Sequence, residues 1–159
     1  MAKKKKKAPD NTIAQNRRAR HDYIIGETFE AGLALQGWEV KSMRDSKVTI
    51  GDAYIQLHQG EAWLYGCHIS PLKTASTHYV AEPTRNRKLL LHANELVKLH
   101  DALQKGGLTI VPLSLYWIRN LVKIKIGTAK GKKLHDKRAA DKDKEWARDK
   151  GRILKESRE

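Results

Sequence analysis

The stretch that decides the fold reads Leu108-Thr-Ile-Val-Pro-Leu-Ser-Leu-Tyr-Trp117, then Ile118-Arg119-Asn120, then Leu121-Val-Lys-Ile-Lys-Ile-Gly127. Two runs rich in β-branched and apolar residues flank a short turn, which is typical of a β-hairpin. In the second run, apolar residues at 122, 124 and 126 alternate with Lys123 and Lys125, so one face is apolar and the other is basic. The chain is therefore expected to contain a sheet with a buried face and a lysine-bearing outer face.

Shorter segments upstream complete the predicted sheet. Alternating or apolar patterns predict strands at residues 21–25, 38–43, 48–57, 62–69 and 88–91, with a hairpin turn at His58-Gln59-Gly60-Glu61. Helical spacing predicts a short helix over 28–35, ending near Gly37, and a second helix around Leu96, Leu99 and Leu103, ending at Gly106-Gly107. Residues 71–83, rich in Thr, Ser and His, predict a long loop. We therefore expect a mainly β fold with two short helices and a small closed β-barrel of the oligonucleotide-binding type.

Positive charge is concentrated at the two ends of the chain. The 159 residues include 32 Lys and Arg against 18 Asp and Glu, a formal charge of +14. Residues 1–20 carry +7 and residues 130–159 carry +5, whereas the segment between them carries +2. This distribution predicts a basic disordered arm at 1–15, a barrel domain at 16–130 and a basic tail at 131–159. Basic arms of this kind order on a polyanion, which favours a nucleic-acid partner.

The sequence offers no pattern for catalysis or for a metal. Cys67 is the only cysteine, and the seven histidines are scattered without ligand spacing. The chain contains no Gly-x-Ser-x-Gly elbow, and Gly127-Thr-Ala-Lys-Gly-Lys-Lys133 lacks the spacing of a phosphate-binding loop. We expect no enzyme activity and no cofactor. Without a signal peptide or a membrane span, we expect a cytoplasmic monomer.

Three basic groups on the body are candidate RNA contacts. They are Arg17, Arg18 and Arg20; Arg85, Arg87 and Lys88; and Lys123 with Lys125. Guanidinium and ammonium groups bind phosphate without reading sequence, so specificity would come from shape or stacking. Glu30 opposes the trend: it would have to accept a hydrogen bond from RNA or orient a neighbouring arginine, unless it only favours a helix N-terminus.

The tail from Asp136 onward can be drawn as an amphipathic helix. Its apolar stripe consists of Trp146, Ile153 and Leu154, and Gly151 interrupts it. Such a narrow stripe cannot bury enough surface to hold a helix in isolation. We therefore expect a tail that is disordered when free and becomes helical on its partner.

Four ordered motifs resemble one family. They are Gly32-Leu-Ala-Leu-Gln-Gly-Trp-Glu-Val-Lys-Ser42, Pro83-Thr-Arg-Asn-Arg-Lys-Leu-Leu-Leu-His92, Val111-Pro-Leu-Ser-Leu-Tyr-Trp117 and Gly127-Thr-Ala-Lys-Gly-Lys-Lys-Leu-His-Asp-Lys-Arg138. They are similar to the SmpB family of SsrA-binding proteins over roughly residues 11–159. The resemblance implies a barrel that binds the tRNA-like domain of tmRNA. It also implies delivery to stalled bacterial ribosomes with elongation factor Tu, through alanyl-tmRNA, for trans-translation.

The resemblance also implies roles for individual residues. The resemblance implies that Asn16, Glu30 and Leu90 contact tmRNA together with Lys123. Lys41, inside the first motif, is also expected to contact tmRNA. On the tail the resemblance implies ribosome contacts in the decoding centre and mRNA channel by Gly131, Lys132, Lys133, His135, Asp136, Lys137, Arg138, Trp146, Ile153 and Leu154. His135 resembles a residue that stacks in the decoding centre. The alternative is a ribosomal or other RNA-binding translation protein without tmRNA specificity.

Overall fold

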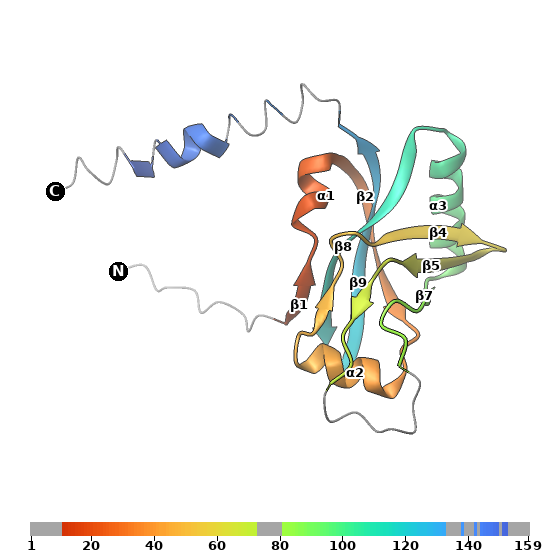
Figure 1. Ribbon diagram of the computed structural model, residues 1–159. Helices are drawn as coiled ribbons and strands as arrows, with labels where there is room; N and C mark the ends of the chain where they lie inside the picture. The colour runs from red at the N-terminus through yellow and green to blue at the C-terminus, as the bar shows by residue number, and fades with distance from the viewer. Residues whose placement is uncertain are drawn as a thin grey trace, which may run out of the picture.

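The computed structural model describes residues 11–72, 81–132, 138, 142, 144–149 and 151–152 (Figure 1). Strands dominate the described body between residues 11 and 132. In chain order the elements are β1 (Thr12–Gln15), α1 (Arg17–Asp22), β2 (Tyr23–Leu33), α2 (Gly37–Arg44), β3 (Val48–Thr49), β4 (Tyr54–His58), β5 (Glu61–Tyr65), β6 (His68–Ile69), β7 (Arg87–Leu90), α3 (Ala93–Gln104), β8 (Leu108–Ile118) and β9 (Leu121–Gly131).

The main sheet closes into a ring. Its strands follow the order β1-β8-β4-β5-β7-β2-β9, and β8 also pairs with β9, so all neighbouring pairs from β8 round to β9 are hydrogen-bonded. All the pairings are antiparallel, and β3 and β6 form a separate two-stranded sheet. The inner face of the ring buries one apolar cluster, which includes Leu64, Ile110, Leu115, Ile124 and Ile126. The fold is therefore mainly β, with the core inside the ring.

The predicted β8–β9 hairpin is confirmed, as are the predicted turn after His58 and the helix before Gly106. β8 and β9 pair from Leu108↔Lys130 to Ile118↔Leu121, and Val122, Ile124 and Ile126 face the core. The turn between β4 and β5 lies at Gln59 and Gly60, both with positive φ. The helix expected before Gly106 is α3, with His92 as its N-cap. Most of the predicted 71–83 loop, residues 73–80, lies outside the described residues.

The helix predicted over 28–35 is wrong, because these residues continue strand β2. Its Phe29 and Leu33 are buried, but so is Ala31 between them, which is the period of a strand. Residues four apart share a face in a helix and in a strand alike. Two apolar residues at that spacing therefore could not distinguish the two structures.

The strand predicted over 38–43 is also wrong, because this segment forms helix α2. Gln36 and Glu39 form a reciprocal capping box at its N-terminus, so Gly37 begins this helix instead of ending the previous one. The buried residues are Trp38, Glu39, Ser42 and Met43, a helical spacing. The structure thus contains more helix than the two short segments expected.

Two N-terminal elements were not expected. Residues 12–15, predicted to belong to a disordered arm, form β1 against β8, and residues 17–22 form α1, where a strand was predicted from 21. The predicted strand over 48–57 is divided into β3 and β4, and that over 62–69 into β5 and β6. Residues 1–10 lie outside the described part of the chain.

Helix α1 covers the upper end of the outer face of the ring (Figure 1). Register shifts in β2, between Ile25 and Thr28, and in β8, between Pro112 and Ser114, change the face to which the following side chains point. A second small apolar cluster therefore forms under α1, where Ala19 packs with Val111, Leu113 and Ala129, and Tyr23 and Ile25 border it. Below α1, the outer face of β2, β9 and β8 stays open.

Candidate nucleic-acid interface

Two lysines of β9 lie at the centre of the open outer face. Lys125 is paired with Glu30 on β2 and with Ser114 on β8, and Lys123 is paired with Gly32 and Tyr116. Lys125 is exposed and Lys123 is half-buried. Neither ammonium has a carboxylate within 4 Å among the described side chains, so both are free to meet phosphate.

A short hydrogen bond fixes the acidic residue of this face. The Tyr116 hydroxyl donates to Glu30 Oε2 over 2.5 Å. Burial, together with this bond and the charge of the Glu30 carboxylate, raises the pKa of Tyr116 far above its usual range. The phenol is therefore a stable donor at neutral pH, and Glu30 presents its second oxygen from a fixed position. Glu30 can thus act as an acceptor for a base edge or a ribose hydroxyl.

Leu90 adds an apolar step to the same surface. It is paired with Gly32, and its side chain is 54% exposed. A Cβ on Gly32 would lie 3.3 Å from Leu90 Cβ, so a side chain at position 32 would crowd Leu90 and glycine avoids this contact. The row Leu90, Gly32, Lys123 and Tyr116 therefore runs across four strands. We call the surface formed by Glu30, Leu90, Tyr116, Lys123 and Lys125 the lysine face.

Lys88 borders the lysine face with its charge partly balanced. Its ammonium lies 2.9 Å from a Glu61 carboxylate oxygen, and both side chains are about two-fifths exposed. On β5, Trp63 is its paired residue and is half-buried. An exposed pair of this kind contributes little to stability and can be opened by a phosphate.

The expectation that Arg87 contacts RNA is corrected by its burial. Its side chain is fully buried, bonded through Nε to Glu39 and through the guanidinium nitrogens to the carbonyls of Cys67 and Pro83. Arg85 also donates to Glu39, over 2.5 Å, and to the carbonyl of Ala34, and retains about a quarter of its exposure. The two arginines therefore connect α2, the end of β2 and the start of β7 from within.

The N-terminal candidates divide in the same way. Asn16 is buried: it caps α1 by accepting from the Ala19 amide and donates to the Pro112 carbonyl, so its observed role is structural. Arg17, Arg18 and Arg20 are exposed, and Arg18 reaches Asp52 over 3.1 Å. Helix α1 thus presents cations at the edge of the lysine face.

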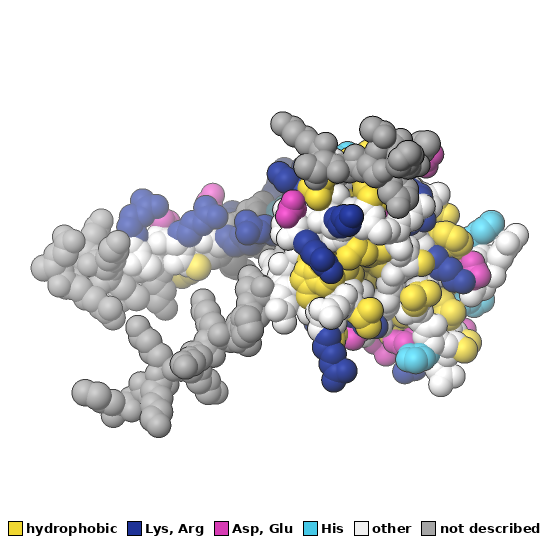
Figure 2. Space-filling model, turned by 90° about the horizontal axis from the view of Figure 1, so that it is seen from below, with side chains coloured by type: hydrophobic (Ala, Val, Ile, Leu, Met, Phe, Trp, Pro, Cys, Tyr) yellow, Lys and Arg dark blue, Asp and Glu magenta, His cyan; other side chains and the backbone are white. Residues whose placement is uncertain are grey.

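Lys41 lies at the opposite end of the molecule from α1. It is exposed on α2, as is Arg44, and α2 lies at the lower end of Figure 1. Seen from this end, apolar side chains gather among Lys and Arg side chains (Figure 2). This end is basic, but it is separate from the contacts of α1.

The junction with the tail is anchored to α1. Gly131, the last residue of β9, is paired with Tyr23, and Lys132 donates its backbone N–H to Asp22 and its Nζ to the Arg20 carbonyl. Arg138 and Trp146 are helical and exposed, Trp146 by 65%. Lys133, His135, Asp136, Lys137, Ile153 and Leu154 lie outside the described residues.

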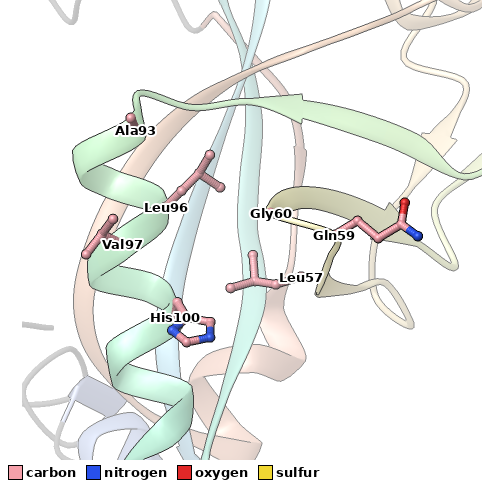
Figure 3. A pocket seen from close by; sticks show the side chains of 7 residues that line it. All are labelled: Leu57, Gln59, Gly60, Ala93, Leu96, Val97 and His100. Carbon is pink, nitrogen blue, oxygen red and sulfur yellow. The ribbon is translucent and has the colours of Figure 1, made fainter.

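One well-formed pocket lies outside this surface. It has a volume of about 620 Å³ between α3 and the β4–β5 turn, where Leu57, Leu96 and His100 face the same space (Figure 3). The described residues that line it are mostly apolar, with no Lys or Arg among them. Across residues 11–72 and 81–132 and the described part of the tail, no three His, Cys, Asp or Glu side chains gather as metal ligands. In the same residues, no helix has the length and apolar character needed to cross a membrane.

The sequence did not reveal the roles of Tyr116, which holds Glu30, and of Glu39, which pairs with Arg85 and Arg87. Tyr116 lies in a run of apolar residues, where its hydroxyl gave the only signal of a polar role. Glu39 lies between Trp38 and Val40, and an acidic residue inside an apolar segment could have indicated a buried partner for an arginine.

Taken together, a closed ring of strands with one outer face of lysines that lack a carboxylate partner among the described residues defines a class of small β proteins suited to a polyanion. The model of the family described as "SmpB protein" matches residues 13–156, and the chain belongs to this family. The SsrA-binding protein of Chromohalobacter salexigens is 56% identical over 155 residues, 98% of this chain and 99% of that one. That of Alkalilimnicola ehrlichii is 55% identical over 152 residues, 96% of this chain and 95% of that one. A solved structure described as "tmRNA-SmpB: a journey to the center of the bacterial ribosome" matches with a TM-score of 0.63 and 45% identity, covering 76% of this chain and 84% of that chain.

Proposed function

We propose that this protein binds the tRNA-like domain of tmRNA and delivers it to stalled bacterial ribosomes for trans-translation. The observation that carries the proposal is the lysine face, where two unpaired ammonium groups flank a carboxylate held by Tyr116. Phosphates would meet the lysines, while Glu30 and Leu90 would contact a base or ribose. Family membership and the structural match to a tmRNA-SmpB complex support the same partner.

In this proposal the ring is a barrel of the oligonucleotide-binding type and acts as a binding module, not as an enzyme. Arg17, Arg18, Arg20, Lys88 and Arg85 border its RNA surface. Arg87 and Asn16 hold that surface in shape from below. The protein acts as a cytoplasmic monomer, and elongation factor Tu joins through alanyl-tmRNA.

The tail has the second role in this proposal. From Gly131 onward it enters the decoding centre and mRNA channel of the small subunit and becomes helical there, with His135 stacking on ribosomal RNA. Exposed Trp146 supports this division, because an exposed indole on a solvated helix lacks a partner within the described part of the protein.

Salt-dependent binding of a tRNA-like-domain fragment tests the function. Replacing Lys123 and Lys125 by Ala should weaken binding and reduce the slope of log K against log salt by about 0.7 to 0.9 for each lost phosphate contact. Lys105→Ala, an exposed lysine after α3, is the matched control and should bind like the wild type. Equal loss in both variants would contradict a localised lysine face.

A ribosome-binding comparison separates the alternative. A ribosomal protein without tmRNA specificity would bind ribosomes from cells lacking tmRNA as well as it binds the fragment. We expect instead that, in competition for binding to this protein, the tRNA-like fragment is more effective than a transfer RNA of the same length. Equal competition by the two RNAs would favour the alternative.

A further inference from the structure

A second, basic pocket opens beside the C-terminal end of α1, where β2 begins. Arg20, Tyr23, Ile24, Leu113, Lys125 and Lys132 are among the residues that line it, and its volume is about 360 Å³. It lies beside the small apolar cluster under α1, and Tyr23, Ile25 and Leu113 belong to both. Its volume falls within the range of about 300 to 1,000 Å³ that small ligands occupy. We call it the ledge pocket.

The walls of the ledge pocket combine cations with apolar surface. Among the described residues that line it, three are basic and none is acidic. Lys132 is held in place because its Nζ donates to the carbonyl of Arg20 over 3.0 Å. Ile24 is 53% exposed although it is a β-branched apolar residue, and the ring of Tyr23 is half-buried beside it. The pocket thus combines an apolar wall with three positively charged side chains.

We infer that the ledge pocket binds one unpaired nucleotide of the tRNA-like RNA. Its base lies against Tyr23 and Ile24, and its phosphate lies against Arg20, Lys125 and Lys132. This inference rests on the proposed function, because Lys125 belongs both to the pocket and to the lysine face. An RNA that covers Lys125 therefore passes the mouth of the pocket. A base splayed out of a loop is the part of an RNA that fits an apolar wall next to a phosphate site.

The inference changes the assignment of Lys132. The family resemblance places this residue in the ribosome-binding tail, whereas its contacts belong to α1 and to the pocket on the body. A nucleotide in the pocket would hold Lys132 and therefore the point from which the tail leaves the body.

Two exposed residues with matched controls test the pocket in the full-length protein. Ile24→Ser removes the apolar wall, and its control is Val97→Ser, an equally exposed apolar residue on α3 (59%). Lys132→Met removes one charge, and its control is Lys105→Met. Thermal melts of all four variants establish that they fold, and Ile24→Leu tests whether an apolar side chain is sufficient.

We expect Ile24→Ser to weaken binding of the tRNA-like fragment several-fold with an unchanged salt slope, because the base loses apolar contact area and no charge is removed. Lys132→Met should lower the salt slope by about 0.7 to 0.9. Ile24→Leu should retain more affinity than Ile24→Ser, and the two controls should bind like the wild type.

Three results would overturn the inference. Wild-type affinity in Ile24→Ser and Lys132→Met, while Lys123→Ala still loses affinity, would remove the pocket and leave the proposed function intact. Losses confined to binding of the small ribosomal subunit would identify ribosomal RNA as the source of the nucleotide. No preference of the wild type for the tRNA-like fragment over an unrelated duplex would remove both proposals.

Discussion

The buried network of Glu39, Arg87 and Arg85 gives the sharpest test of how the charges are divided between core and surface. Glu39 and Arg87 are both fully buried, and Glu39 also accepts from the Gln36 backbone N–H over 2.7 Å. Glu39→Gln keeps the size of the side chain but leaves the Arg87 charge without its counterion. Arg87→Met leaves the carboxylate with the partly exposed Arg85 and the Gln36 N–H.

The size of the effect follows from the burial. Removing one partner of a buried ion pair costs about 3 to 5 kcal/mol, because the other charge stays buried and uncompensated. For a chain of this size, 1 kcal/mol corresponds to roughly 2 to 4 °C in Tm, so each single variant should melt about 6 to 20 °C lower. The double variant Glu39→Gln with Arg87→Met should lose less than the sum of the two.

Thermal melts followed by circular dichroism measure the stability, and fragment binding below the melting range measures the surface. We expect the folded Arg87→Met variant to bind the tRNA-like fragment within about 2-fold of the wild type, with an unchanged salt slope. A variant that melts normally but loses affinity and salt slope would show that Arg87 contacts RNA and that our account of its burial is wrong.

Three further outcomes follow from other contacts. Tyr116→Phe should weaken fragment binding several-fold at an unchanged salt slope, because Glu30 loses the donor that fixes it; an unchanged affinity would show that Glu30 does not face RNA. Burial raises the pKa of the Cys67 thiol to about 11, so the folded state keeps a proton that the unfolded chain loses near pH 9. The unfolding free energy should therefore fall between about pH 9 and 11, by at most about 1.4 kcal/mol per pH unit, and chemical denaturation of Cys67→Ala should lack this component. Truncation after Lys132 should preserve fragment affinity and abolish tagging in a translation assay; a large loss of affinity would place RNA contacts in the tail.

The hairpin that follows α3 could be predicted because its pattern has one interpretation. Apolar residues at every second position of β9 alternate with lysines. This pattern fits a strand with one solvent-exposed face and does not fit a helix. The segment around Phe29 was ambiguous, since a spacing of four suits both structures. The capping box of Gln36 and Glu39 carried the signal for α2, but it lay beside a glycine that also suits a helix exit.

The interface could be predicted only in part for a different reason. A sequence shows which residues are cationic but not which of them have found a carboxylate. Lys123, on the solvent-exposed side of an alternating strand, was placed correctly on the outer face. Arg87 follows a loop, and the sequence around it predicts equal solvent exposure. Burial of Arg87 depends on Glu39, which is 48 positions away in the chain and lies on another element.

The near-neutral charge of the body conceals a cationic face because several of its acidic residues are engaged elsewhere. Glu39 is inside the core, Glu61 is paired with Lys88, Asp52 with Arg18 and Glu27 with Lys98. What remains on the outer face of β2, β9 and β8 is a pair of lysines beside a carboxylate that Tyr116 holds in position. The salt dependence of RNA binding should therefore count these unpaired cations and those of α1, and not the net charge of the body, since only charges that release counterions contribute to the slope.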